Sequence, residues 1–126
     1  MFTGLITKTI VNIALILITV VAGIILHKAG KPYNTGLFTV HKLATVAFAV
    51  LIIRMVIACA KNYGLNFFTT ILLILSAVSV LGLLISGGAM SLNKSHELML
   101  TIHRISTAVF LLSISGLFYE FFHLKH

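Results

Sequence analysis

The chain has 126 residues, of which 60% are hydrophobic and only 9% charged, and its mean hydropathy is +1.16. This composition excludes a water-soluble domain of this size, because so much apolar surface would aggregate. The formal net charge of +7 comes from nine Lys and Arg against two Glu, and the basic residues stand singly at the ends of apolar runs. That distribution favours anchoring at lipid headgroups and excludes nucleic-acid binding, which needs a clustered basic face.

Four segments are long and apolar enough to cross a membrane, since about 20 helical residues span the roughly 30 Å hydrocarbon core. The first is expected over residues 6–27 and ends before Gly30 and Pro32, which do not continue a helix. It is too long for a signal-peptide core and lacks a small-residue cleavage site, so we expect it to be retained. The other three spans are expected over residues 36–60, 66–88 and 95–122.

The loops between these segments are short, so neighbouring helices are expected to run antiparallel. The predicted fold is an all-α, transmembrane, up-down-up-down four-helix bundle that forms a single integral membrane domain over residues 1–126. We expect a multi-pass protein of a prokaryotic inner membrane. In a bundle of this order the second and fourth helices are diagonal partners.

A short motif occurs twice, 62 residues apart. Residues 39–45 read TVHKLAT and residues 101–107 read TIHRIST, and Phe48 and Phe110 match at the same offset. Because the offset is about half of the chain, the sequence predicts two fused helical hairpins. The threonines that follow each histidine by one turn are expected to bond main-chain carbonyls of their own helices.

His41 and His103, one from each copy of the motif, are the candidate metal ligands. Imidazole binds haem iron strongly, and two helix-borne histidines can approach one iron from opposite faces. Gly23, one turn before His27, and Gly87, near the end of the third span, are small enough to make room for a porphyrin. Two alternatives stay open: the paired imidazoles bind another metal, or they make interhelical hydrogen bonds.

Several nearby residues extend this candidate site. Lys42 and Arg104 directly follow the paired histidines, and ionisable residues inside a span by default mark function. Helical side chains tilt toward the helix N-terminus, so these cations are expected to reach toward the membrane surface and the propionates of a haem. His27 and His96 lie nearer that surface, where they can contact propionates, carry protons for a quinone, ligate a second cofactor or lie among headgroups.

Small residues of the third span have two readings. Together with Gly87, they can leave space for a flat cofactor beside the histidines. They are equally typical of close helix packing in membranes. The residues concerned are Ser79, Gly82 and Ser86.

With its Gly-x3-His motif, its His-Lys and His-Arg steps and its four spans, the chain resembles membrane-bound b-type cytochromes of the cytochrome b561 kind. The resemblance implies haem b held by histidines of a four-helix core, and electron transfer between a quinol or ascorbate-type donor and an acceptor. Two-haem members of that family carry a second histidine about four turns further along the same helix. Here Met55 and Leu117 stand fourteen residues past His41 and His103, so one haem is expected.

The leading hypothesis is therefore a haem b protein that exchanges electrons with membrane quinol or a redox partner protein. Two axial histidines leave no open position on the iron, so no catalytic residue is assigned, and a role in a quinol-linked oxidoreductase stays open. One alternative is a transition-metal binder or transporter that uses His27, His41, His96 and His103. Another is a non-catalytic membrane subunit that anchors a larger complex or forms a homo-oligomer.

Overall fold

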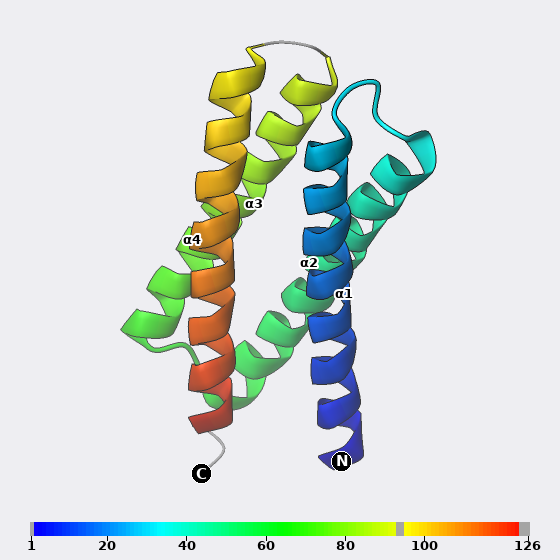
Figure 1. Ribbon diagram of the computed structural model, residues 1–126. Coiled ribbons are helices and arrows are strands. Elements are labelled where there is room, and N and C mark those ends of the chain that lie inside the picture. The colour runs from blue at the N-terminus through cyan, green and yellow to red at the C-terminus, as the bar shows by residue number, and fades with distance from the viewer. Residues whose placement is uncertain (1, 93–94, 124–126) are drawn as a thin grey trace. The chain divides into compact units, whose positions relative to one another are not determined.

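The structure, a computed structural model, describes residues 2–92 and 95–123. It contains the helices α1 (Phe2–Ala29), α2 (Thr35–Tyr63), α3 (Phe67–Ser91) and α4 (His96–His123), shown in Figure 1. No strand occurs in the two described ranges, and the expected all-α fold with four helices is confirmed.

The chain divides into two compact units, and each is described by itself. The N-terminal unit, Met1–Ala58, contains α1 and most of α2. The C-terminal unit, Cys59–His126, contains the last turn of α2 together with α3 and α4. Each unit is thus built around one helical hairpin, as the internal repeat predicts.

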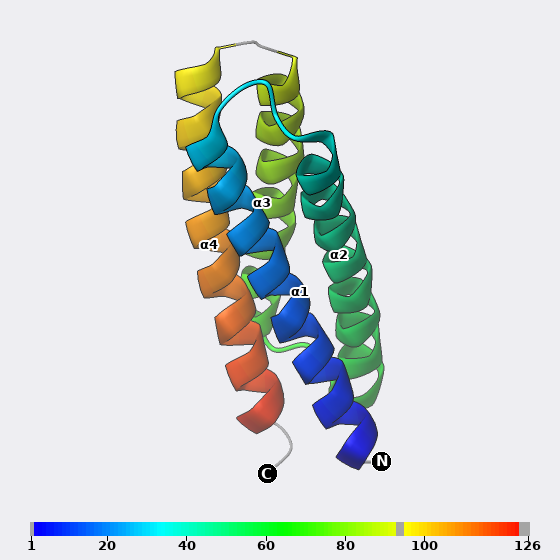
Figure 2. The ribbon, with the colours of Figure 1, turned by 45° about the vertical axis from the view of Figure 1, so that its right-hand side comes forward.

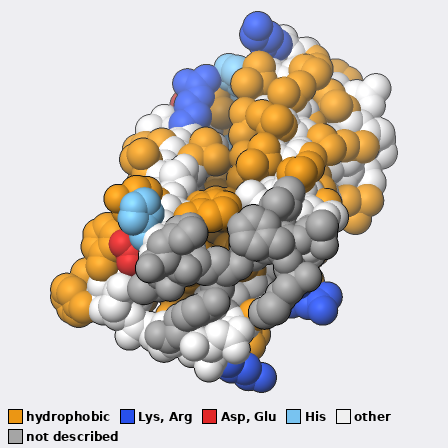
Figure 3. Space-filling view, turned by 90° about the horizontal axis from the view of Figure 1, so that it is seen from below, with side chains coloured by type: hydrophobic (Ala, Val, Ile, Leu, Met, Phe, Trp, Pro, Cys, Tyr) orange, Lys and Arg blue, Asp and Glu red, His pale blue; other side chains and the backbone are white. Residues whose placement is uncertain are grey.

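All four helices are long and apolar enough to cross a membrane. Large aliphatic side chains point outward along them, and Leu43, Ile85 and Leu112 are 64%, 69% and 74% exposed. On the face seen in Figure 3, much of the described surface is apolar. Helices that are apolar all round are stable in lipid, so the chain is a multi-pass integral membrane protein.

Glycines end the first two helices. Gly30 has a φ of +70° and donates its N–H to Leu26 O at 3.2 Å, and Gly64 has a φ of +72° and donates to Ala60 O at 3.2 Å. Glycine adopts this left-handed conformation without a steric penalty, and such residues commonly close a helix. The prediction that the first helix ends before Gly30 is confirmed.

Small residues line the packed face of the α3–α4 hairpin, whose helices lie against each other in both Figure 1 and Figure 2. A Cβ built on Gly82 would collide with the side chain of Ser106 on α4. Four buried serines donate their hydroxyls to carbonyl oxygens four residues earlier on their own helices: Ser76 to Leu72, Ser79 to Leu75, Ser86 to Gly82 and Ser113 to Val109. The Gly82–Ser106 contact is close helix packing of the kind expected in membranes, and the serine bonds satisfy buried hydroxyls within their own helices.

Substituting Gly82 should therefore loosen the hairpin. In G82V the added side chain meets Ser106, and overpacking of this kind costs about 1–3 kcal/mol. The matched control is G88V on the same helix, because a Cβ at Gly88 has no atom within 4 Å. The measurement is reversible unfolding in mixed micelles, followed by far-UV circular dichroism. Equal stability of the two variants would contradict this account of the packing.

Candidate functional site

In the N-terminal unit, α2 holds the half-buried His41 against α1. Its Nδ1 lies 2.8 Å from the main-chain carbonyl oxygen of Thr19. A carbonyl oxygen only accepts hydrogen bonds, so Nδ1 must carry the hydrogen and donate it. In the neutral ring, the lone pair is then on Nε2, and this is the nitrogen that would have to bind a metal.

The ring of His41 rests on Gly23. A Cβ at that position would lie 3.1 Å from Cε1 and 3.4 Å from Nδ1 of His41, closer than most side chains approach. The absence of a side chain therefore lets the imidazole reach the backbone of α1. The sequence suggested that Gly23 makes room for a porphyrin, and the group it accommodates in the structure is the imidazole of His41.

In the C-terminal unit, α4 holds the half-buried His103 against α3. Its Nδ1 lies 3.0 Å from Oγ of Ser86, whose side chain is fully buried. The same Oγ donates to Gly82 O at 2.6 Å. Because the serine has one hydrogen and that short bond uses it, the oxygen accepts from Nδ1–H of His103. The lone pair of this imidazole is again on Nε2.

The two units thus repeat one arrangement. In each, a histidine on the second helix donates through Nδ1 to an acceptor on the first helix. Thr45 donates to His41 O at 2.7 Å and Thr107 to His103 O at 2.8 Å, which confirms the expected bonds to their own helices. A Cβ at Gly87 would lie 3.7 Å from Cε1 of His103, an ordinary contact.

The cations of the repeated motif are both exposed. Lys42 is exposed, and its Nζ lies 4.2 Å from the centre of the Phe38 ring, one turn earlier. The side chain therefore extends toward the N-terminus of α2, the direction expected from the sequence. Arg104 is exposed on α4. Phe48, seven residues past His41, is buried, and Phe110 is half-buried.

The remaining two candidate histidines lie near helix ends. His27 is exposed in the last turn of α1. His96 is half-buried at the start of α4, and its Nδ1 has no hydrogen-bond partner among the described residues. Within residues 2–92 and 95–123 the structure contains no group of three or more His, Cys, Asp or Glu placed to hold a metal ion.

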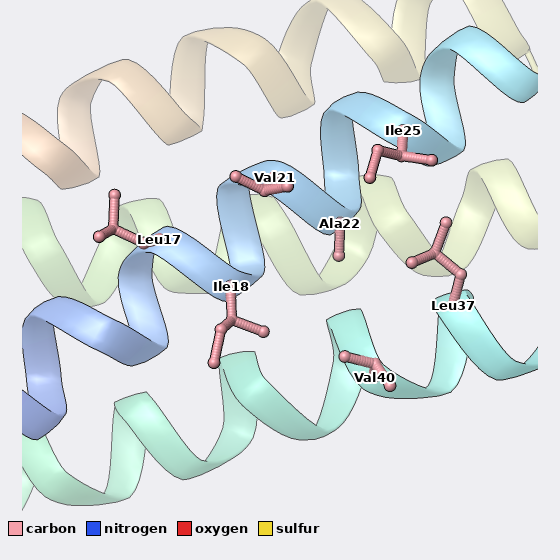
Figure 4. Close-up of a pocket in the computed structure, with 7 residues that line it drawn as sticks. All are labelled: Leu17, Ile18, Val21, Ala22, Ile25, Leu37 and Val40. Carbon is pink, nitrogen blue, oxygen red and sulfur yellow. The ribbon is translucent and has the colours of Figure 1, made fainter.

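A groove in the N-terminal unit runs between α1 and α2 and has a volume of about 360 Å³. Figure 4 shows its lining, which is aliphatic throughout: Leu17, Ile18, Val21, Ala22, Ile25, Leu37 and Val40. With no polar side chain in it, the groove offers hydrocarbon contacts and no recognition of a polar group.

Sequence reasoning missed the two acceptors, Thr19 O and Ser86 Oγ. Ser86 carried a usable signal, because it is a hydroxyl within an apolar span at the depth of the histidines. The acceptor at Thr19 is main-chain, so no residue type reveals it. The only local hint is Gly23, four residues later, which leaves space for a ring.

Comparison of the chain with protein family models, with curated proteins and with solved structures finds no match.

The chemistry that the site can support follows from its two imidazole side chains. In each unit an imidazole donates through Nδ1, so its lone pair is on Nε2 when the ring is neutral, and it stands within a helix that can cross a membrane. Such a nitrogen is a good ligand for haem iron and for zinc, copper or nickel.

The two glycines should respond differently to substitution. In G23A the new methyl group pushes the His41 ring away from α1 and weakens its bond to Thr19 O, whereas G87A adds only an ordinary contact to His103. The measurement is side-chain ¹⁵N–¹H spectroscopy of histidine-labelled protein in micelles without added haem. We expect the His41 signals to shift in G23A and the His103 signals to stay in place in G87A. Unchanged His41 signals in G23A would overturn this view of the contact.

Proposed function

We propose that the chain is a membrane cytochrome that binds one haem b through His41 and His103 and transfers single electrons. The observation that supports this most is the repeated arrangement: each helical hairpin carries one imidazole that donates through Nδ1 and has its lone pair on Nε2.

The donor set suits this cofactor. An iron porphyrin supplies four ring nitrogens itself, so the protein has to provide only the remaining ligands to the iron. Two histidine side chains are a common pair of such ligands. Most structural zinc sites, by contrast, need four protein ligands. When bound, haem supplies a one-electron carrier. His41 and His103 would hold the iron and would leave it no position for a substrate, so the chain would carry electrons and not convert a substrate there.

The other candidate residues have supporting roles in this proposal. Gly23 keeps the His41 ring against α1. Lys42 and Arg104 pair with the propionate carboxylates, which lowers the cost of charge within the membrane. His27 lies in the last turn of α1 and His96 at the start of α4. In this proposal they contact propionates or exchange protons with a quinone.

The electron donor in this proposal is a membrane quinol or a redox partner protein, and the membrane is a prokaryotic inner membrane. The short loops leave little surface for binding a soluble donor unaided. A partner subunit or a second copy of this chain therefore completes the electron path.

The test is a reduced-minus-oxidised absorption spectrum of the purified chain, expressed with sufficient haem. We expect a Soret band and an α-band, and loss of most bound haem in H41A and in H103A. H123A is the matched control, because His123 is exposed at the C-terminal end of α4. A spectrum without haem bands, or one that survives the double substitution of His41 and His103, would refute the proposal.

Two other outcomes would point to other functions. Stoichiometric transition metal without porphyrin in elemental analysis would indicate a metal binder. Co-purification with soluble subunits in the absence of haem would indicate an anchor subunit.

A further inference from the structure

We infer that Ser86 is a positioning residue for His103: it fixes the imidazole as the Nδ1–H tautomer and strengthens Nε2 as a ligand. The second half of this inference rests on the proposed function, whereas the first half concerns the protein without any cofactor. Nothing in the sequence motif itself, residues 101–107, indicates this role.

The direction of the hydrogen bonds follows from the distances around Ser86 Oγ. Gly82 O lies 2.6 Å away, Leu83 O lies 3.3 Å away and Nδ1 of His103 lies 3.0 Å away. Two oxygens at 2.6 Å are held together only by a hydrogen between them, and a carbonyl has none to give. The serine hydrogen therefore points at Gly82 O, and His103 must donate to the serine oxygen.

The hydrogen bond from His103 is made to a buried serine side chain, so its loss would be costly. Ser86 is 0% exposed, and its helix crosses an apolar medium where an unmade hydrogen bond is costly. A hydroxyl that already donates to a carbonyl is a better acceptor, because hydrogen bonds in a chain polarise one another. An imidazole that donates to such an acceptor has a fixed ring orientation and a more basic second nitrogen.

The hydrogen bond from Nδ1 of His41 has an acceptor of another kind. Its acceptor is the main-chain oxygen of Thr19, which no substitution removes. The Nδ1 acceptor of His103, by contrast, belongs to a side chain that can be replaced. In S86A the ring loses its acceptor and the site loses only one oxygen atom in volume.

Ser79 provides the matched control. It lies on the same helix, is 5% exposed and donates to Leu75 O at 2.7 Å, four residues earlier, as Ser86 does to Gly82 O. The structure gives it no hydrogen bond to a histidine among the described residues. S79A therefore removes an equivalent buried hydroxyl and leaves the His103 bond intact.

The first experiment uses histidine-labelled protein in micelles, purified without haem, and reads the tautomer from the ring ¹⁵N signals. We expect His103 to be the Nδ1–H tautomer in the natural chain and in S79A, and to shift toward the Nε2–H tautomer in S86A. S86T, which keeps a hydroxyl, should restore the Nδ1–H form. An unchanged Nδ1–H tautomer in S86A would overturn the inference.

The second experiment uses haem-loaded protein and measures haem affinity and midpoint potential. Loss of such a bond to a metal-bound histidine weakens affinity about 10- to 100-fold. A more basic imidazole favours oxidised iron, so the potential should rise in S86A, and a tenfold larger loss for the oxidised form corresponds to about 59 mV. S79A should keep the natural values. An unchanged potential and affinity in S86A would remove the ligand-strengthening role.

The two experiments separate the possible failures. If the chain binds no haem, the proposed function fails, while the tautomer measurement still decides whether Ser86 positions His103. If haem binds through His41 and His103 but S86A behaves like S79A in both experiments, the function stands and the role of Ser86 is refuted.

Discussion

The cost of an unmade hydrogen bond inside hydrocarbon accounts for the contacts of the buried serines and of the two motif histidines. Hydroxyls such as those of Ser76 and Ser113 donate to carbonyls of their own helices, and the two histidines donate across their hairpins. For an imidazole, satisfying one nitrogen determines the state of the other, because a neutral ring has one hydrogen to place. The same bond that makes His41 and His103 tolerable in a membrane therefore also determines which nitrogen would bind the metal in the proposed function.

The two hairpins reach this result by different means. The histidine and its neighbours are shared between α2 and α4, but the 62-residue offset places Gly23 of α1 opposite Ile85 of α3. The acceptors differ accordingly, a main-chain oxygen in one unit and a serine hydroxyl in the other. The first helix of each hairpin supplies an acceptor of a different kind, in keeping with a repeat that is visible in α2 and α4 and faint in α1 and α3.

The sequence was sufficient for the helices, since apolar runs of this length have few alternatives and Gly30 marks a helix end. It was less informative about where helix α2 ends, because polar residues such as Lys61 and Asn62 end the apolar run but still belong to the helix. It indicated His41 and His103 through the repeat but not their partners. A main-chain acceptor has no residue-type signal, and a serine in a membrane helix most often bonds its own backbone, as Ser79 does.

From the sequence, the small residues of α3 were compatible with helix packing or with a cofactor site, and in the structure they both pack against α4 and contact His103. A serine side chain is short, so Ser86 reaches the His103 ring only if α3 and α4 lie close together. Gly82, one turn earlier, permits that approach, since any side chain there would meet Ser106. The carbonyl of Gly82 also takes the serine hydrogen and so leaves its oxygen as an acceptor. Packing therefore sets the distance and the direction of the bond to His103, and a change that loosens the hairpin would alter the histidine even without touching it.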